Sequence, residues 1–383
     1  MKIAIINNIF DPFQRGGADK ISRNLADGFL ATGDEIFFIA ACPYWSKNPF
    51  SKYPGYFLKS LFYDLKNFPF FLRFFWHIFD MFDFRTYYQT IKILKKEKPD
   101  LVITNNLKGL GYLIPRAIAS QKIKHIHIIH DIQLIHPSGL MFWGEENKIN
   151  TLAVKVYCHI NSFLFKKTNW VISPSQWLLD LHNAKKIFKN CPAKVTPNPI
   201  EATKEAENEK QKNSKQIIYV GEIVEHKGLK TLLKSIEIVK KHDPEINLLI
   251  IGRGDWSDKL QEAIKGKDYI KYLGRQENEQ VKKYLSESGI IVVPSLCYEN
   301  SPTVIYEGIQ QNCLVVASRI GGITELVREL GGLLFVPGDE KNLSEKIIDS
   351  LDNYERLIIT FEEKRKNIKK YKLETYIKEI KSL

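Results

Sequence analysis

Short runs of β-branched and aliphatic residues alternate with longer amphipathic segments along the whole chain. In the first half these runs predict strands at 2–7, 35–40, 100–104, 125–129 and 170–172. The second half repeats the pattern at 216–220, 247–251, 269–273, 290–293, 314–317 and 333–335. Strands that alternate with helical segments indicate a parallel sheet covered by helices on both faces. The predicted fold class is therefore α/β, with doubly wound parallel sheets that bind ligands at the carboxyl ends of their strands.

The length of the chain predicts two domains. Its 383 residues exceed what one hydrophobic core usually organises, and an apolar content of 44% is enough for two cores. We place the boundary near Pro197-Asn198-Pro199, because two prolines stiffen the chain there. The polar run at 201–215 has no apolar period and is interpreted as an exposed linker. The predicted domains are 1–198 and 199–365.

Cysteine usage and the N-terminus indicate the cellular compartment. Five scattered cysteines lack C-x-x-C or metal-ligand spacing, which favours a reducing environment and predicts no structural zinc. The first residues are typical of a short strand followed by a loop, without the apolar region or cleavage site of a signal peptide. We therefore expect a cytoplasmic protein.

The formal net charge of +12 indicates anionic partners, among them nucleotide sugars, nucleic acids and the negative face of a membrane. The lysines are dispersed through predicted helices, and no helix-turn-helix, zinc-finger or RNA-binding signature is present among them. Nucleic acid is therefore not expected as a partner.

The segment 50–88 is unusually rich in aromatic residues. Four side chains interrupt its densest part: Arg73, His77, Asp80 and Asp83. These interruptions argue against a membrane-spanning helix, which needs about 20 mostly apolar residues. Two interpretations stay open. The segment is either an amphipathic helix in the interface of an anionic membrane, aided by nearby lysines, or a helix pair packed on the first sheet.

Two carboxylates, Glu299 and Glu307, lie eight positions apart across a predicted strand-to-helix junction. The run 289–294 predicts a buried strand, and Ser301-Pro302 supplies an N-cap hydroxyl followed by the residue favoured at the first helical position. The helix is therefore expected to begin within 300–303.

The start of this predicted helix suits a phosphorylated sugar. The free backbone amides from Asn300 to Thr303 and the positive end of the helix dipole favour a phosphate. Glu299 can accept hydrogen bonds from sugar hydroxyls, and Glu307, one turn further on, can reach a ribose. A capped helix with a surface glutamate stays open as the alternative.

This Glu, seven residues, Glu pattern resembles the signature of retaining glycosyltransferases of family four, which have the two-domain GT-B fold. Further motifs agree with the family in order and spacing: Gly16-Gly17, His130-Asp131, Ser173-Pro174-Ser175, Pro197-Asn198-Pro199-Ile200, Tyr219-Val220-Gly221, Lys227-Gly228, Gly252-Arg253-Gly254, Leu273-Gly274 and Ser318-Arg319-Ile320-Gly321-Gly322. The resemblance covers nearly the whole chain. It implies two Rossmann-like domains facing a cleft, with a C-terminal helix at about 366–383 that crosses back onto the first domain.

The resemblance also implies a diphosphate clamp with one departure. The family carries an arginine and a lysine in a Gly-Arg, four residues, Lys-Gly arrangement, and this chain has Gly221-Glu222 before Lys227-Gly228. Lys227 matches, whereas Glu222 places an anion where the arginine is usual. Three explanations stay open. Glu222 turns outward while Arg253 or His226 compensates, turnover is reduced, or the donor is held differently.

The remaining site residues follow from the same resemblance. His130 is expected at the end of a buried strand, where it contacts the donor sugar without having to carry a proton, and it joins Lys227 and Glu299 as a predicted catalytic residue. The predicted donor-binding residues are Gly16, Gly17, Glu222, Gly252, Arg253, Arg275, Asn300, Ser301, Pro302, Thr303 and Glu307. No cofactor and no divalent metal are expected, since no Asp-x-Asp pair stands at a predicted strand end.

The sequence thus predicts a retaining glycosyltransferase that moves a sugar from a nucleoside diphosphate donor to a hydroxyl of a glycan or lipid-linked acceptor. We expect it to act in cell-surface polysaccharide or glycolipid synthesis, with peripheral contact to the inner face of the cell membrane. Two alternatives stay open. One is a nucleotide-sugar epimerase of the same architecture, and the other is a nonenzymatic nucleotide-sugar-binding scaffold, which Glu222 in the clamp would suit.

Overall fold

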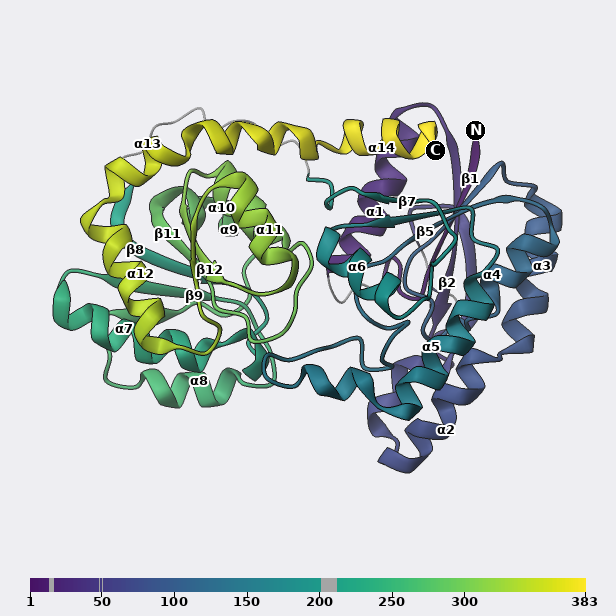
Figure 1. Cartoon of the computed structure of the whole chain (residues 1–383), viewed down its shortest axis with the longest axis horizontal. Helices are drawn as coiled ribbons and strands as arrows, with labels where there is room; N and C mark the ends of the chain where they lie inside the picture. The colour runs from purple at the N-terminus through teal and green to yellow at the C-terminus, as the bar shows by residue number, and fades with distance from the viewer. Residues whose placement is uncertain (14–16, 48, 50, 201–211) are drawn as a thin grey trace. The chain divides into compact units, whose positions relative to one another are not determined.

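The computed structural model describes residues 1–13, 17–47, 49, 51–200 and 212–383. These residues form two compact units, each built around one sheet (Figure 1). The N-terminal unit comprises Met1–Leu140, Asn147–Pro199 and Leu373–Leu383. The C-terminal unit comprises Met141–Glu146 and Ile200–Lys372, so a short segment from the first half of the chain belongs to it.

The N-terminal unit contains a seven-stranded sheet with the order β3-β2-β1-β4-β5-β6-β7, in which all neighbouring strands are parallel. The strands are β1 (Lys2–Asn7), β2 (Glu35–Cys42), β3 (Gly55–Lys59), β4 (Leu101–Thr104), β5 (Lys124–Ile128), β6 (Trp170–Ser173) and β7 (Ala193–Val195). The central strands β1 and β4 are almost entirely buried, as expected of a parallel sheet covered on both faces.

Helices cover this sheet (Figure 1). They are α1 (Gly17–Ala31), α2 (Phe70–Met81), α3 (Phe84–Glu97), α4 (Ile114–Ser120), α5 (Leu152–Phe165), α6 (Gln176–Ala184) and α14 (Leu373–Ser382), with the 3₁₀ segments η1 (Leu61–Asn67) and η2 (Glu146–Asn150). The side chains of Asp83, Thr151 and Ser175 cap α3, α5 and α6 by accepting backbone N–H groups. The last helix, α14, packs on α1 and adds Tyr376, Ile377 and Ile380 to the core.

The C-terminal unit contains a six-stranded parallel sheet with the order β10-β9-β8-β11-β12-β13. Its strands are β8 (Asn213–Val220), β9 (Asn247–Ile251), β10 (Ile270–Tyr272), β11 (Ser288–Val293), β12 (Leu314–Ser318) and β13 (Leu333–Phe335). Its helices are α7 (Leu229–His242), α8 (Ser257–Ile264), α9 (Asn278–Glu287), α10 (Thr303–Gln310), α11 (Gly321–Leu330), α12 (Glu340–Asp352) and α13 (Tyr354–Arg365), with η3 (Glu225–Lys227) and η4 (Lys366–Tyr371).

Two hydrophobic clusters lie on opposite faces of this second sheet. Neighbouring residues of one strand belong to different clusters, as Ile217 and Ile218 in β8 and Leu248 and Leu249 in β9 show. This follows from the strand geometry, which points successive side chains to opposite faces. The observed fold confirms the predicted class, α/β with two doubly wound parallel sheets.

Three details differ from the sequence prediction. The predicted linker 201–215 is partly wrong, because residues 213–215 already belong to β8, while 201–211 lie outside the described residues. The sequence did not predict the edge strands β3 and β7. The segment 50–88 contains β3, η1, α2 and the start of α3. Among the described residues, no helix is long and apolar enough to cross a membrane.

Candidate functional site

Three loops meet at the carboxyl edge of the C-terminal sheet, on strands that are neighbours in it. The N–H of Gly221, after β8, donates to Ile251 O at the end of β9 (3.0 Å). The N–H of Gly252, after β9, donates in turn to Gly274 O after β10 (2.9 Å). The loops predicted from separate sequence motifs therefore form one continuous edge, which is where doubly wound sheets bind ligands.

Two glycines allow these loops to approach closely. Gly228 has a φ of +76°, and a Cβ at this position would lie 1.8 Å from Pro294 O. Gly252 has a φ of +147°, and its Cβ would lie 1.7 Å from Gly221 O. Both positions therefore require glycine for space as well as for backbone conformation.

Lys227 and Glu299 form an ion pair at this edge. Lys227 Nζ donates to Glu299 Oε2 at 2.7 Å, and the Ser295 hydroxyl donates to Oε1 of the same carboxylate. The two loops are also joined through the backbone, since Leu296 N–H donates to His226 O (2.9 Å). The ion pair is partly open to solvent, with 23% of the Lys227 side chain and 18% of the Glu299 side chain exposed. A ligand can therefore reach both charges.

The charges of this pair support each other. Burial alone would raise the pKa of Glu299, but the charge of Lys227 and the hydrogen bonds from Lys227 and Ser295 together lower it below its usual value. Burial would likewise lower the pKa of Lys227, yet Glu299 raises it. Both groups are therefore charged at neutral pH, and a bound phosphate would meet a permanent ammonium ion.

The helix after β11 begins within the predicted range 300–303, but its cap differs from the prediction. The helix α10 starts at Thr303 with Pro302 as its N-cap residue, so the prediction of Ser301 as N-cap and Pro302 as first helical residue is wrong. The Ser301 hydroxyl instead lies 2.5 Å from the hydroxyl of Tyr306, and both residues are buried. Proline supplies no capping side chain, and in the preceding loop Glu299 O accepts the Gly322 N–H (2.9 Å).

The other predicted donor-binding residues of this unit differ in how exposed they are. Asn300 and Glu307 are partly buried, and Glu307 lies one turn into α10. Glu222, Arg253 and Arg275 are exposed, and the backbone carbonyl of Glu222 accepts a hydrogen bond from Tyr219 (2.8 Å). Glu222 is thus exposed to solvent.

The segment Met141–Glu146 binds the loop that carries Glu299. Trp143 N–H donates to Leu296 O (2.9 Å), and the Tyr298 hydroxyl donates to the Glu146 carboxylate (2.8 Å). The sequence analysis did not single out these residues. No local signal could have found them, because the contact joins positions more than 150 residues apart.

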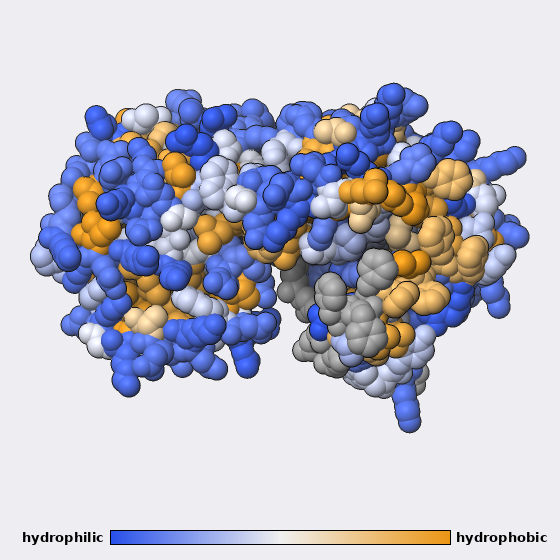
Figure 2. Space-filling view, turned by 60° about the horizontal axis from the view of Figure 1, so that its bottom comes forward, coloured by the Kyte–Doolittle hydropathy of each residue, from blue (hydrophilic) through white to orange (hydrophobic). Residues whose placement is uncertain are grey.

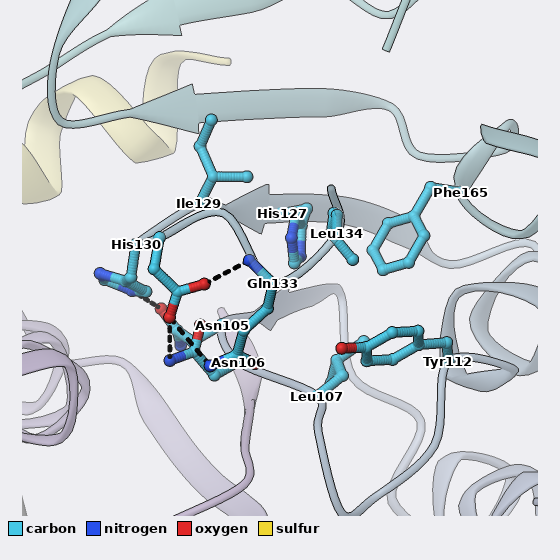
Figure 3. A pocket seen from close by; sticks show the side chains of 11 residues that line it. Asn105, Asn106, Leu107, Tyr112, His127, Ile129, His130, Gln133, Leu134 and Phe165 are labelled. Carbon is cyan, nitrogen blue, oxygen red and sulfur yellow. Dashed lines mark hydrogen bonds between the residues drawn. The ribbon is translucent and has the colours of Figure 1, made fainter. Parts of the chain in front are cut away.

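In the N-terminal unit, His130 belongs to a polar cluster at the end of β5. Its Nε2 lies 2.8 Å from Asn105 Oδ1, and Asp131 accepts hydrogen bonds from Gln133 N–H (2.7 Å) and Asn106 Nδ2 (3.4 Å) (Figure 3). Burial lowers the pKa of His130 to about 4. The imidazole is therefore neutral at pH 7 and available as a hydrogen-bonding group rather than as a cation.

Figure 3 shows these side chains around a small cavity of about 10 Å³. A volume of this size holds about one water molecule, so the cavity is far too small for a sugar. Burial raises the pKa of Asp131 to about 6, against the opposing hydrogen bonds of Gln133 and the charge of Lys108. The cluster is thus a hydrogen-bonded polar edge and not a closed substrate pocket.

Two asparagine pairs complete this cluster and were missed by the sequence analysis. Asn7 ends β1 and Asn8 follows it, Asn105-Asn106 follows β4, and these two strands are neighbours. Asn8 N–H donates to Asn106 O (2.7 Å), and Asn7 Oδ1 accepts the Asn106 N–H (3.2 Å). The signal was an Asn-Asn pair at the end of each of two predicted strands. Of the predicted glycines, Gly17 begins α1, and Gly16 lies outside the described residues.

Two family models match almost the whole chain when taken together. Residues 15–204 match the model described as "Glycosyltransferase Family 4", and residues 201–375 match "Glycosyl transferases group 1". A relative described as an uncharacterized 42.6 kDa protein in the cps region of Klebsiella pneumoniae is 23% identical over 346 residues, which span 88% of this chain and 90% of the relative.

Solved structures of similar fold cover the chain from end to end. Sucrose-phosphate synthase from Thermosynechococcus elongatus aligns with a TM-score of 0.73 and 18% identity, over 100% of this chain and 97% of that protein. Anabaena Alr3699/HepE, solved in complex with UDP-glucose, aligns with a TM-score of 0.69 and 15% identity over 100% of both chains. Together with the two parallel sheets, these likenesses show the GT-B fold.

Proposed function

Because the chain belongs to the family of group 1, family 4 glycosyltransferases, we propose that it transfers a sugar from a nucleoside diphosphate donor with retention of configuration. The acceptor is a hydroxyl of a glycan or of a lipid-linked glycan. The observation that carries this proposal is the Lys227–Glu299 ion pair, which stands partly exposed where the loops of the C-terminal sheet converge.

In this proposal Lys227 stabilises the departing diphosphate. Negative charge develops on the leaving phosphate oxygen as the bond to the sugar breaks, and a fixed ammonium ion lowers the energy of that state. Lys227 is fixed because Glu299 and the backbone contact between Leu296 and His226 hold its loop in place. Glu299, with one oxygen bound by Ser295 and the other by Lys227, orients the lysine and can accept a hydrogen bond from a sugar hydroxyl.

The surrounding residues fit a diphosphate as well. Thr303 at the start of α10 presents the backbone amides of a helix N-terminus, and Glu307 one turn later can reach a ribose. Arg253 and Arg275 are exposed on the neighbouring loops and can supply the cation that Glu222 does not. Donors with uridine are the first to test, since the similar HepE structure was solved with UDP-glucose.

The proposal assigns His130 to binding and not to proton transfer. A neutral imidazole can hold a donor hydroxyl, while the acceptor proton passes to the leaving phosphate oxygen. We further propose that no divalent metal takes part, because Lys227 already supplies the positive charge. Turnover that persists in EDTA would support this, and turnover that needs added magnesium or manganese would contradict it.

The biological setting is proposed from a relative. The Klebsiella pneumoniae relative is a protein of the cps region, and it aligns over nearly the whole chain. This supports a role in cell-surface polysaccharide or glycolipid synthesis, with the enzyme acting in the cytoplasm at the inner face of the membrane.

The decisive site experiment measures nucleoside diphosphate release from a panel of UDP-, GDP- and dTDP-sugars, with and without lipid extract. Lys227→Gln is expected to lower kcat by roughly 10²–10³, the loss typical of removing one preorganised group from a developing charge. Lys230→Gln is the matched control, because Lys230 is exposed three residues away in α7. Its rate should stay within about twofold of the native enzyme, as for most surface substitutions.

The other outcomes separate the alternatives. An unchanged rate in Lys227→Gln would contradict the site assignment. Tight donor binding without release by the native protein would favour a nonenzymatic scaffold, and an epimerised donor without acceptor transfer would favour an epimerase.

A further inference from the structure

The helix α2 is fixed to the N-terminal unit through one of its faces. The backbone N–H of Gly109 donates to both carboxylate oxygens of Asp80 (2.9 Å each), and this aspartate is buried. Met81 is also buried, and the Trp76 ring packs near Phe62 of η1 at a centroid distance of 6.4 Å. These contacts determine which side of α2 faces away from the unit.

The outward side of α2 and the start of α3 are apolar and exposed. We call this set the α2–α3 apolar face: Leu72, Phe75, Ile78, Phe79, Phe82, Phe84 and Tyr88. Phe79 is 73% exposed and Phe84 is 60% exposed. Figure 2 shows apolar side chains gathered over the N-terminal unit. An exposed apolar surface of this density is more often an interaction site than a surface that contacts only water.

The exposed charged residues that continue this face along α3 are positive. Along α3, Phe84 and Tyr88 are continued by Lys92 and Lys95 at helical spacing, and both lysines are exposed. The acidic residues of the same stretch are engaged elsewhere. Asp80 binds Gly109, Asp83 caps α3 and Glu97 pairs with Lys2 (2.8 Å). The surface therefore combines exposed aromatic side chains with exposed cations.

We propose that the α2–α3 apolar face, together with Lys92 and Lys95, docks on a membrane surface that contains anionic lipids. The 12 residues of α2 span about 18 Å, too short for the roughly 30 Å hydrocarbon core, so the helix lies in the interface. Its aromatic side chains enter the boundary between headgroups and acyl chains, and the lysines contact lipid phosphates. This inference is independent of the proposed sugar transfer.

The charge pattern favours a membrane over a second copy of this chain. A symmetric dimer built on this face would cover Lys92 and Lys95 of both copies with a surface whose acidic residues are already engaged, so these lysines would lack partners. An anionic bilayer neutralises the same lysines. Attraction by lipid phosphates also falls with ionic strength, whereas the apolar contribution does not.

The test is co-sedimentation of the full-length protein with two kinds of vesicle, phosphatidylcholine alone and an equal mixture of phosphatidylcholine and phosphatidylglycerol. The native protein should partition mainly onto the mixed vesicles, and added salt should weaken the binding. Phe79→Gln combined with Phe84→Gln should reduce the partition coefficient roughly tenfold or more, since two exposed aromatic anchors are lost. The control is Ile359→Gln in α13 of the C-terminal unit, which is 69% exposed and should bind like the native protein.

A second pair of variants tests the charges. Lys92→Gln with Lys95→Gln should reduce binding to the mixed vesicles severalfold and should abolish part of its salt dependence. Lys364→Gln with Lys369→Gln in the C-terminal unit is the matched control, because both lysines are exposed there. Circular dichroism and the thermal midpoint show whether each variant remains folded.

Several results would overturn the proposal. One is a native protein that fails to sediment with the mixed vesicles. Another is a folded aromatic double variant that binds as tightly as the native protein. A third is an aromatic double variant that is a monomer in light scattering where the native protein is a dimer, while both bind vesicles equally. This result would assign the face to a second copy of the chain.

Discussion

Glu222 is the residue that departs most clearly from the family pattern, and its position explains how the site tolerates it. The side chain is exposed, while the residue's carbonyl is held by Tyr219. The carboxylate still contributes to the field at Lys227, where it raises the lysine pKa to a small extent. Glu222 is therefore exposed and close enough to Lys227 to act on it electrostatically.

Removing this charge should strengthen donor binding. Glu222→Gln is expected to lower the donor KM severalfold. The substitution removes a negative charge that repels the diphosphate, and such a repulsion at the protein surface costs about 1 kcal/mol of binding free energy. Glu225→Gln is the control, as Glu225 is exposed in the same loop. A higher KM in Glu222→Gln would show instead that this carboxylate binds the donor, which is an adapted role.

Asp80 gives a second prediction at this scale, on pH and stability. Burial raises its pKa to about 7, although the Gly109 N–H opposes the shift. The folded protein therefore keeps the carboxyl protonated between about pH 4 and pH 7, whereas the unfolded chain releases the proton. The contribution of Asp80 to the unfolding free energy is fully present below the pKa that Asp80 has in the unfolded chain. It is lost as the pH rises towards 7.

The measurement compares the native protein with Asp80→Asn, which keeps a carbonyl oxygen for Gly109. Relative to this variant, the native N-terminal unit should lose up to about 4 kcal/mol of unfolding free energy between pH 4 and pH 7.5. Urea unfolding at the two pH values measures the difference. An equal difference at both values would show that Asp80 is not buried as described.

The sequence predicted single site residues better than their contacts. Lys227 and Glu299 were each identified from a motif, but their ion pair depends on two loops that meet only after β8 and β11 pair. Asn105 and Asn106 were overlooked because asparagine after a strand is common in turns. Their partners, His130 and Asp131, lie on the adjacent strand's loop, which no local pattern reveals.

At the scale of elements, glycine positions decide how closely the site loops pack. Gly228 and Gly266 have nearly equal φ values, +76° and +77°. They differ in space, since a Cβ on Gly228 would collide with Pro294 O whereas nothing lies within 4 Å of one on Gly266. Substitutions at these two glycines therefore separate the free-energy cost of the backbone conformation from the cost of a steric collision.

Gly228→Ala should lower the unfolding free energy by more than about 2 kcal/mol and should also displace Lys227, so activity falls with stability. Gly266→Ala should cost only about 1 kcal/mol and leave the donor KM unchanged. Chemical denaturation and donor kinetics on both variants measure these effects. Equal losses in the two variants would contradict the close contact between Gly228 and Pro294.

Element prediction succeeded where a run is mainly apolar, even at a sheet edge. The predicted runs 2–7, 247–251 and 333–335 agree with β1, β9 and the short edge strand β13 residue for residue. The edge strand β7 also has three residues, but its middle residue is Lys194, so no apolar run indicates it. The edge strand β3 lies inside an aromatic segment whose composition suits a helix as well as a strand. Such short edge elements are fixed by pairing with a neighbour, which the sequence does not display locally.

At the scale of the whole molecule, the chain passes between its two units more often than a simple two-domain order requires. Met141–Glu146 joins the C-terminal unit, and Leu373–Leu383 joins the N-terminal unit. The helix α14 contributes core residues to the N-terminal unit, so the two ends of the chain stabilise the same core. The segment Met141–Glu146 ties the loop of Glu299 to a part of the chain that lies between two stretches of the N-terminal unit. Length and period indicated two domains, and the family resemblance implied that the C-terminal helix returns to the first domain, but nothing in the sequence indicated that Met141–Glu146 joins the C-terminal unit.

The central claim is retaining glycosyl transfer that depends on Lys227. The most direct test determines the anomeric configuration of the transferred sugar by NMR, with a productive donor from the panel and its acceptor, while nucleoside diphosphate release is followed in the same sample. We predict one released nucleoside diphosphate for each transferred sugar and a product with the configuration of the donor. An inverted product, or donor binding without any release, would contradict the account.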